Sequence, residues 1–252
     1  MGSVTFYTKR GNCSTVARNV LRRDNKGTLH TNKTNTTRKM SILIALVALG
    51  APALRKPMET GGQQTTIAII MDFEEPYSDS VLEAIQDETE RILRPSGLQL
   101  EWRFYEKSPI HRGILNREAV IRFQGRCRAG DPPPAHVKQS ALALTHLSGK
   151  VVLPYADVHC DQVWNLIQDE IRPKTPPRTE VLLGRAVGRV LAHELYHVLA
   201  KTTKHAAAGL AKAGLSAQEL VSRQQGLDKG ALGMIRESLA APRADDSALE
   251  CK

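Results

Sequence analysis

One segment constrains the fold of this chain more than any other: residues 181–200 read as a single apolar helix interrupted by a few polar side chains. Its polar pentapeptide is His193-Glu194-Leu195-Tyr196-His197, and apolar residues flank it on both sides. Residues four apart lie about 40° apart around an α-helix, so both imidazoles point to the same side. The pattern predicts a buried helix whose polar stripe faces a cleft.

This H-E-x-x-H spacing is typical of zinc hydrolases, in which both imidazoles bind one metal ion and the glutamate acts on a water molecule. The alternative is a pair of hydrogen-bonded core histidines beside a surface glutamate. Burying two histidines and a carboxylate without an ion costs free energy, which favours the metal site. Along the same helix Gly184, Gly188 and Ala192 recur every four residues. They predict a face without bulk that packs closely on a sheet or a second helix.

Catalytic zinc usually takes three protein ligands, so the motif requires a third, and two residues are candidates. His205 lies eight residues after His197, beyond a polar stretch where the helix can end and the chain can turn back. Glu219 lies further on, in Ser216-Ala217-Gln218-Glu219, a capping box in which a glutamate ordinarily bonds the backbone at a helix start. Because imidazole is a common third ligand at such sites, we favour His205 and keep Glu219 as the alternative.

Other short patterns accompany the motif along roughly residues 65 to 225. They are Cys127-Arg128, Thr145-His146, Leu153-Pro154, Asp157-x-x-Cys160-Asp161 and Ser216-Ala217-x-Glu219-Leu220. Together with His193-Glu194-Leu195-x-His197, seven residues and His205, they resemble a group of exported, largely uncharacterised bacterial H-E-x-x-H proteins. The resemblance implies a zincin-like fold related to the metzincins. It also implies zinc bound by His193, His197 and His205, with Glu194 as the catalytic base.

The chain departs from these relatives at two positions, Tyr196 and Ala211, where members usually carry glycine and methionine. Ala200 and Thr203 also replace the glycine and the last histidine of the standard metzincin pattern. The departures leave the expected ligands in place and bear on turnover more than on metal binding. Met234 is a candidate for the methionine beneath the metal of metzincins, with core packing as the interpretation that we favour.

Three neutral imidazoles leave Zn²⁺ its full positive charge, which acidifies water and polarises a carbonyl. Glu194 would take the proton of the attacking water and pass it to the leaving amine. The predicted function is zinc-dependent hydrolysis of peptide bonds in a peptide or protein substrate. The alternatives are a degenerate zincin that binds zinc and a protein partner without turnover, and a structural domain without metal.

Other side chains are candidates for roles around this centre. The oxyanion formed by attack of water needs a hydrogen-bond donor besides the metal. Candidates for this donor are Tyr155, His159 and Tyr196, and we assign the role to none of them. Arg185 and Arg189 share the helix stripe of the histidines and are candidates for binding a substrate carboxylate, with salt bridges at the solvent edge as the alternative.

The amino end predicts export. Arg38-Lys39 precede Met40, and an uncharged apolar stretch of about fourteen residues follows, too short for a membrane span of roughly twenty. It holds Ala51-Pro52-Ala53, an A-x-A cleavage pattern. We therefore expect a signal peptide over residues 40–53, a secreted or periplasmic protein, and no stable membrane span after cleavage. Residues 1–39 would be a disordered or mis-annotated extension; an uncleaved anchor behind a basic tail is the alternative.

The net charge of +9 belongs to this leader. Residues 1–53 hold nine basic residues and one acidic residue, which gives +8, so residues 54–252 carry +1. The net charge of the mature chain therefore gives no support for a nucleic-acid partner. In an oxidising compartment Cys127 and Cys160 could form a disulfide and leave Cys251 free. Cysteine ligation of zinc is discounted because the chain has no C-x-x-C pair.

Hydrophobic periodicity over the mature chain predicts an α/β domain. Strands are expected at residues 66–71, 98–104, 119–123 and 150–155, and helices at 80–93 and 161–171, with a linker at 173–177. The first strand, helix and strand imply a right-handed parallel crossover. By analogy with zincins, 150–155 could be an edge strand that pairs with substrate. The expected whole is a single zincin-like domain over 54–240, in which a mixed twisted sheet packs on the active-site helix and a helical carboxy-terminal part follows. A polar tail covers 241–252.

Overall fold

The computed structural model describes residues 3–5, 9–11, 65–105, 118–130, 141–171 and 175–241. All of them belong to one compact unit. The expected signal peptide at 40–53, nearly all of the extension at 1–39 and of the tail at 241–252, and Cys251 lie outside the described residues.

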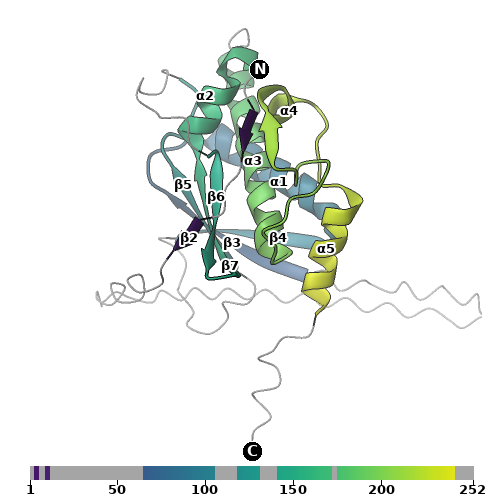
Figure 1. The fold of residues 1–252 in the computed structure, drawn as a ribbon. Helices are drawn as coiled ribbons and strands as arrows, with labels where there is room; N and C mark the ends of the chain where they lie inside the picture. The colour runs from purple at the N-terminus through teal and green to yellow at the C-terminus, as the bar shows by residue number, and fades with distance from the viewer. Residues whose placement is uncertain are drawn as a thin grey trace, which may run out of the picture. The chain divides into compact units, whose positions relative to one another are not determined.

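A mixed, six-stranded sheet forms one layer of the domain (Figure 1), in the order β2-β6-β7-β5-β3-β4. Four strands run parallel: β3 (Thr65–Phe73), β4 (Leu98–Phe104), β5 (Glu118–Gln124) and β7 (Val151–His159). The strand β6 (Ala143–Ser148) is antiparallel to β7 and parallel to β2 (Lys9–Gly11). The expected α/β class with a mixed sheet is confirmed.

The strand β6 was missed by the hydrophobic pattern. Its buried side presents Ala143, Thr145 and Leu147, of which only leucine is large and apolar. Within residues 150–155, β6 pairs with Val151 and Val152 on one side of β7. On the other side of β7, pairing with β5 begins only at Tyr155, so residues 151–154 keep an edge position there, in line with the expected edge strand.

The first crossover is built as expected. Helix α1 (Asp79–Leu93) connects β3 to its parallel neighbour β4, followed by the short η1 (Arg94–Ser96) and Gly97 in the left-handed conformation, with φ 82°. The helix starts earlier than predicted, with Ser78 as its N-cap.

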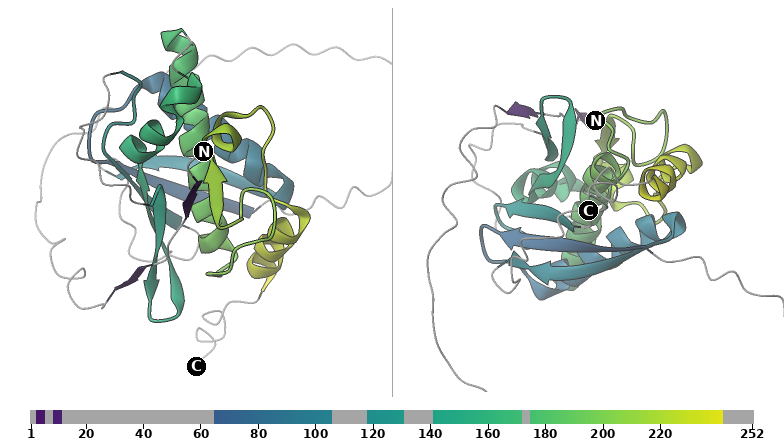
Figure 2. Two further views of the ribbon diagram at one scale, coloured as in Figure 1. Left: turned by 45° about the horizontal axis from the view of Figure 1, so that its top comes forward. Right: turned by 90° about the horizontal axis from the view of Figure 1, so that it is seen from below.

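The long helix α3 (Pro176–Leu199) carries the H-E-x-x-H motif and packs on α1, β6 and β7. It absorbs part of the predicted linker, because proline is well tolerated in the first turn of a helix. The stripe of small residues faces α1 as expected. A Cβ on Gly184 would meet Val81 and Ala84, and one on Gly188 would meet Ile85. Figure 2 shows α3 between the parallel strands and the carboxy-terminal elements.

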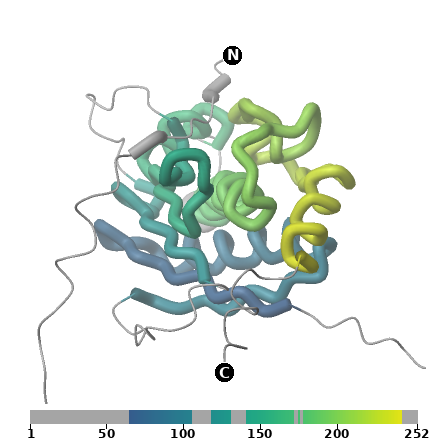
Figure 3. Tube along the Cα trace, turned by 60° about the horizontal axis from the view of Figure 1, so that its bottom comes forward, coloured from purple at the N-terminus to yellow at the C-terminus, as the bar shows by residue number. Residues whose placement is uncertain are grey.

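The carboxy-terminal part contains β8 (Gly214–Ser216), α4 (Ala217–Val221) and α5 (Lys229–Ala240), and folds back beside α3 (Figure 3). Strand β8 pairs with β1 (Ser3–Thr5). The capping box at the start of α4 is confirmed, with both of its reciprocal hydrogen bonds.

Helix α2 (Cys160–Ile171) follows β7 directly and confirms the helix expected at 161–171. Its first residue forms a disulfide with Cys127, with the Cα atoms 5.1 Å apart, so the expected pairing of Cys127 with Cys160 is confirmed. Among the described residues no helix is long and apolar enough to cross a membrane.

Candidate metal centre

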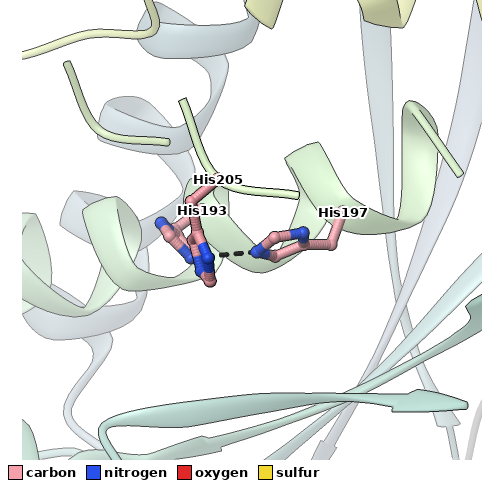
Figure 4. A group of neighbouring side chains, drawn as sticks. All are labelled: His193, His197 and His205. Atoms are coloured by element: carbon pink, nitrogen blue, oxygen red, sulfur yellow. Dashed lines mark hydrogen bonds between the residues drawn. The ribbon is translucent and has the colours of Figure 1, made fainter. Parts of the chain in front are cut away.

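Three imidazoles converge at the carboxyl end of α3 (Figure 4). His193 and His197 project from the helix, and His205 projects from the segment that follows it. One ring nitrogen of each lies within 4.8 Å of the others, and the ring centroids are 4.8 to 5.2 Å apart. Among the described residues, this is the one group of three potential metal ligands.

The hydrogen bonds of the two helical histidines determine which nitrogen carries the proton. His193 Nδ1 lies 2.6 Å from the carbonyl oxygen of Leu210, and His197 Nδ1 lies 2.8 Å from that of Thr202. A carbonyl oxygen can only accept, so each Nδ1 must be the donor. In a neutral imidazole the other nitrogen, Nε2, then holds a lone pair. These two Nε2 atoms face each other at 3.1 Å.

Burial keeps these rings neutral. Removal from water lowers the pKa of His193 to about 3, with a smaller contribution from the neighbouring His197. Burial likewise lowers the pKa of His197 to about 4 and lowers that of His205. Two neutral rings that approach with lone pairs at 3.1 Å repel each other unless a cation lies between them. The donor set therefore fits a metal ion that prefers nitrogen, as Zn²⁺ does.

The segment after α3 turns sharply enough to bring His205 back to the helix. Lys201 adopts a left-handed conformation, with φ 48°, just beyond the helix end. The amide of Thr202 then donates to the carbonyl of His197, while the carbonyl of Thr202 accepts from the His197 ring. The hydroxyl of Tyr196 donates to the carbonyl of Lys204, which immediately precedes His205. The same segment thus carries the third histidine and orients the second.

Glu194 is buried among these groups, with 1% of its surface exposed. Its Oε2 accepts a hydrogen bond of 2.6 Å from the hydroxyl of Thr145 on β6. Burial raises the pKa of Glu194 to about 8, and the Thr145 hydrogen bonds act in the opposite direction.

Two buried polar atoms in this region lack a hydrogen-bond partner in the described part of the chain: Glu194 Oε1 and His205 Nε2. Buried polar atoms in proteins are nearly always satisfied. A cation between the histidines and a water beside the carboxylate would satisfy both, so the residues present fit a metal centre.

No family model matches the chain, and no curated protein matches it. Among solved structures it is similar to archaemetzincin from Methanopyrus kandleri, with 14% identity and a TM-score of 0.42 over 73% of this chain and 100% of that one. It is also similar to a zinc-dependent peptidase from Methanocorpusculum labreanum, with 10% identity and a TM-score of 0.39 over 67% and 99%. At these levels the likenesses assign no residue and no activity.

Glu219, the alternative third ligand, lies apart from the three histidines. Its Oε2 accepts from the backbone amide and the hydroxyl of Ser216, and its Oε1 accepts from Lys212. Both carboxylate oxygens are therefore engaged in capping α4 and in an ion pair.

Arg189 does not line a cleft, so that expectation is wrong. Its side chain is fully buried, and its guanidinium donates to Glu88 on α1 and to the carbonyls of Glu219, Leu220 and Ser222 at the end of α4. The alternative was a salt bridge at the solvent edge. Arg189 does form a salt bridge with an acidic residue, Glu88, but the pair is buried. Arg185 is partly buried nearby, and its charge contributes to lowering the pKa of Arg189 after the larger effect of burial.

The oxyanion candidates occupy different surroundings. His159 bonds the carbonyl of Ala141, and Tyr155 packs edge-on against His146. Tyr196 is 1% exposed, and its hydroxyl lies 3.6 Å from Met234 Sδ as well as bonding Lys204. Met234 therefore contacts Tyr196 and is partly exposed, which is not the core packing that we favoured. Thr145, the partner of Glu194, had no assigned role, because no local pattern links residues 49 positions apart.

Proposed function

We propose that this protein is a zinc-dependent peptidase in which His193, His197 and His205 hold Zn²⁺ and Glu194 is the general base. One observation carries the proposal: two buried, neutral imidazoles turn lone pairs toward each other at 3.1 Å, with the third ring beside them. Lone pairs this close repel each other unless a cation lies between the rings, and zinc takes nitrogen ligands of this kind. Three nitrogen ligands leave a fourth position of a tetrahedral site open, which is typical of catalytic rather than structural zinc.

Bound there, zinc would supply a Lewis acid that acidifies water and polarises the scissile carbonyl. The chain's own residues handle the proton. Thr145 occupies Oε2 of Glu194, which leaves Oε1 to take the proton of the attacking water and to deliver it to the leaving amine. The carbonyls of Leu210 and Thr202 hold the two helical imidazoles in the tautomer that presents Nε2 to the centre.

The alternative is a degenerate zincin that binds zinc without turnover, which would be favoured if the Tyr196 side chain filled the cleft. The Tyr196 side chain points elsewhere. Its hydroxyl is directed to Lys204 and Met234 inside the protein, and the residue is buried. Tyr196 therefore supports the segment that carries His205 instead of obstructing the site.

We further propose that the protein acts outside the cytoplasm on peptide or protein substrates, after removal of a signal peptide at 40–53. The disulfide between Cys127 and Cys160 supports this location, since such bonds persist mainly in oxidising compartments.

The test combines metal analysis with a peptide-library assay. Wild type and Glu219→Ala should each hold one zinc per chain and cleave peptides. His205→Ala should lose zinc, and Glu194→Ala should keep zinc but lose cleavage. Circular dichroism of each variant checks that it is folded. Zinc lost only in Glu219→Ala would overturn the ligand assignment. Stoichiometric zinc in a wild type that cleaves no peptide would establish the degenerate alternative.

A further inference from the structure

We infer that Thr145 is a positioning residue for Glu194. We also infer that the β-bulge in β7, together with the contact between His146 and Asp157, fixes the direction of the Thr145 side chain. The inference rests on the proposed function, because it concerns how the general base is oriented.

The contact is short, buried and specific. Thr145 is fully buried on the face of β6 that meets α3, and its Oγ1 lies 2.6 Å from Glu194 Oε2 and 3.4 Å from the Glu194 carbonyl oxygen. The hydroxyl has one proton, and the shorter contact to the carboxylate takes it. A valine would fill this position without a polar group to satisfy. Burying a hydroxyl is unfavourable unless it is bonded, and Glu194 supplies the bond.

This hydrogen bond orients the carboxylate. The last torsion of a glutamate is broad and has no strong preference of its own, so an unrestrained carboxylate would turn its oxygens through many directions. With Oε2 held by Thr145, Oε1 is the oxygen left without a partner among the described residues. The contact thereby selects which oxygen is available for the proton.

A β-bulge lies immediately beside Thr145. In the β6–β7 ladder Thr145 pairs with Ala156, but the next pair is Leu147 with Val152. Strand β6 advances by two residues while β7 advances by four, so β7 contains two extra residues at this point. Bulges bend a strand and re-aim side chains, and they are common next to active sites.

His146 lies beside this bulge, on the face of the sheet opposite to Thr145, and contacts Asp157 and Tyr155 of β7. Its Nε2 lies 2.9 Å from Asp157 Oδ2, and its ring packs edge-on against Tyr155 at 4.6 Å. Because neighbouring residues of a strand point to opposite faces, anchoring His146 on one face fixes the direction of Thr145 on the other. The chain of contacts runs from Asp157 through His146 and the backbone to Thr145 and Glu194.

The experiment compares Thr145→Val, which keeps the shape and removes the donor, with Thr145→Ser, which keeps the donor. In the zinc-loaded protein Thr145→Val should lower kcat roughly 10- to 100-fold with KM nearly unchanged, as expected for a misplaced catalytic group. Zinc content should stay at one per chain, and Thr145→Ser should recover most of the rate. The matched control is Thr89→Val, since Thr89 is also fully buried and hydrogen-bonded but lies between α1 and α3. That variant should melt at a lower temperature with kcat unchanged.

A second readout does not depend on turnover. In the zinc-free protein, the melting-temperature shifts of Thr145→Val and Glu194→Ala should fall short of additivity in the double variant, because each change removes the one contact that the two side chains share. His146→Phe should lower kcat in the same direction and add little to Thr145→Val.

The outcomes separate the two claims. A wild type that holds zinc and cleaves no peptide refutes the proposed peptidase, and with it a role for Thr145 in that reaction. An active wild type with unchanged kcat in Thr145→Val refutes the inference alone. Additive melting shifts also refute it, whatever the activity.

Discussion

Replacing Gly184 by alanine tests the close packing of helix α3, which carries the H-E-x-x-H motif, on α1. Alanine is favoured over glycine inside a helix by about 1 kcal/mol, so from the helix alone the variant should be more stable. A Cβ at this position, however, would lie 2.5 Å from the Val81 carbonyl oxygen and 2.5 Å from Ala84 Cβ. The first contact is backbone, which no side-chain rotation relieves, so α1 and α3 must move apart.

Overpacking of this kind typically costs about 1–3 kcal/mol, and the backbone contact places Gly184→Ala near the upper end. After subtracting the helix gain, we expect a net loss of about 2 kcal/mol in the free energy of unfolding. For a domain of this size that corresponds to a melting temperature lower by roughly 4–8 °C. Urea unfolding followed by circular dichroism measures the loss.

The matched control is Gly233→Ala on α5, where an added Cβ would meet nothing within 4 Å in the described structure. This variant should gain up to about 1 kcal/mol from helix propensity. If Gly184→Ala gained stability to the same extent as Gly233→Ala, the proposed contact between α1 and α3 would be refuted.

Two further predictions concern the site and its support. Tyr196→Phe removes the hydrogen bond to the Lys204 carbonyl beside His205 and should weaken zinc binding about 10-fold, measured by chelator competition; an unchanged dissociation constant would contradict this role. For Glu88, burial raises the pKa, but Arg91 and Arg189 outweigh it and hold the pKa below 4.5 in the folded protein. The ion pairs should therefore stabilise the fold above about pH 4.5 and lose this contribution as the pH falls through the lower folded value. Glu88→Gln should flatten that acid dependence, and an identical pH profile would count against it.

Part of the candidate metal site could be predicted because His193 and His197 lie close together in the sequence. Two histidines four residues apart share one side of any α-helix, whatever the helix packs against. The alternation of residues 98–104 likewise predicted β4 with its observed bounds. The capping box at Ser216 and the small-residue face of α3 follow the same logic, since each depends on residues within a few turns of one another.

The rest depended on contacts between distant segments. Spacing alone left His205 and Glu219 both open, and only the turn after Lys201 brings His205 to the other rings while Glu219 caps α4. Arg189 lies on the same helix stripe as His193, yet the position of α4 makes it a buried structural group.

Hydrogen bonds between distant segments determine the protonation of the histidine nitrogens and the orientation of the Glu194 carboxylate. The sequence by itself determined that two imidazoles and a carboxylate occur together on one helix. Only the tertiary structure decided which nitrogen is protonated and which carboxylate oxygen is held, because the carbonyl of Leu210 and the hydroxyl of Thr145 come from other segments. Periodicity reports which face of an element is buried, but the orientation of a polar atom depends on the partner it meets there.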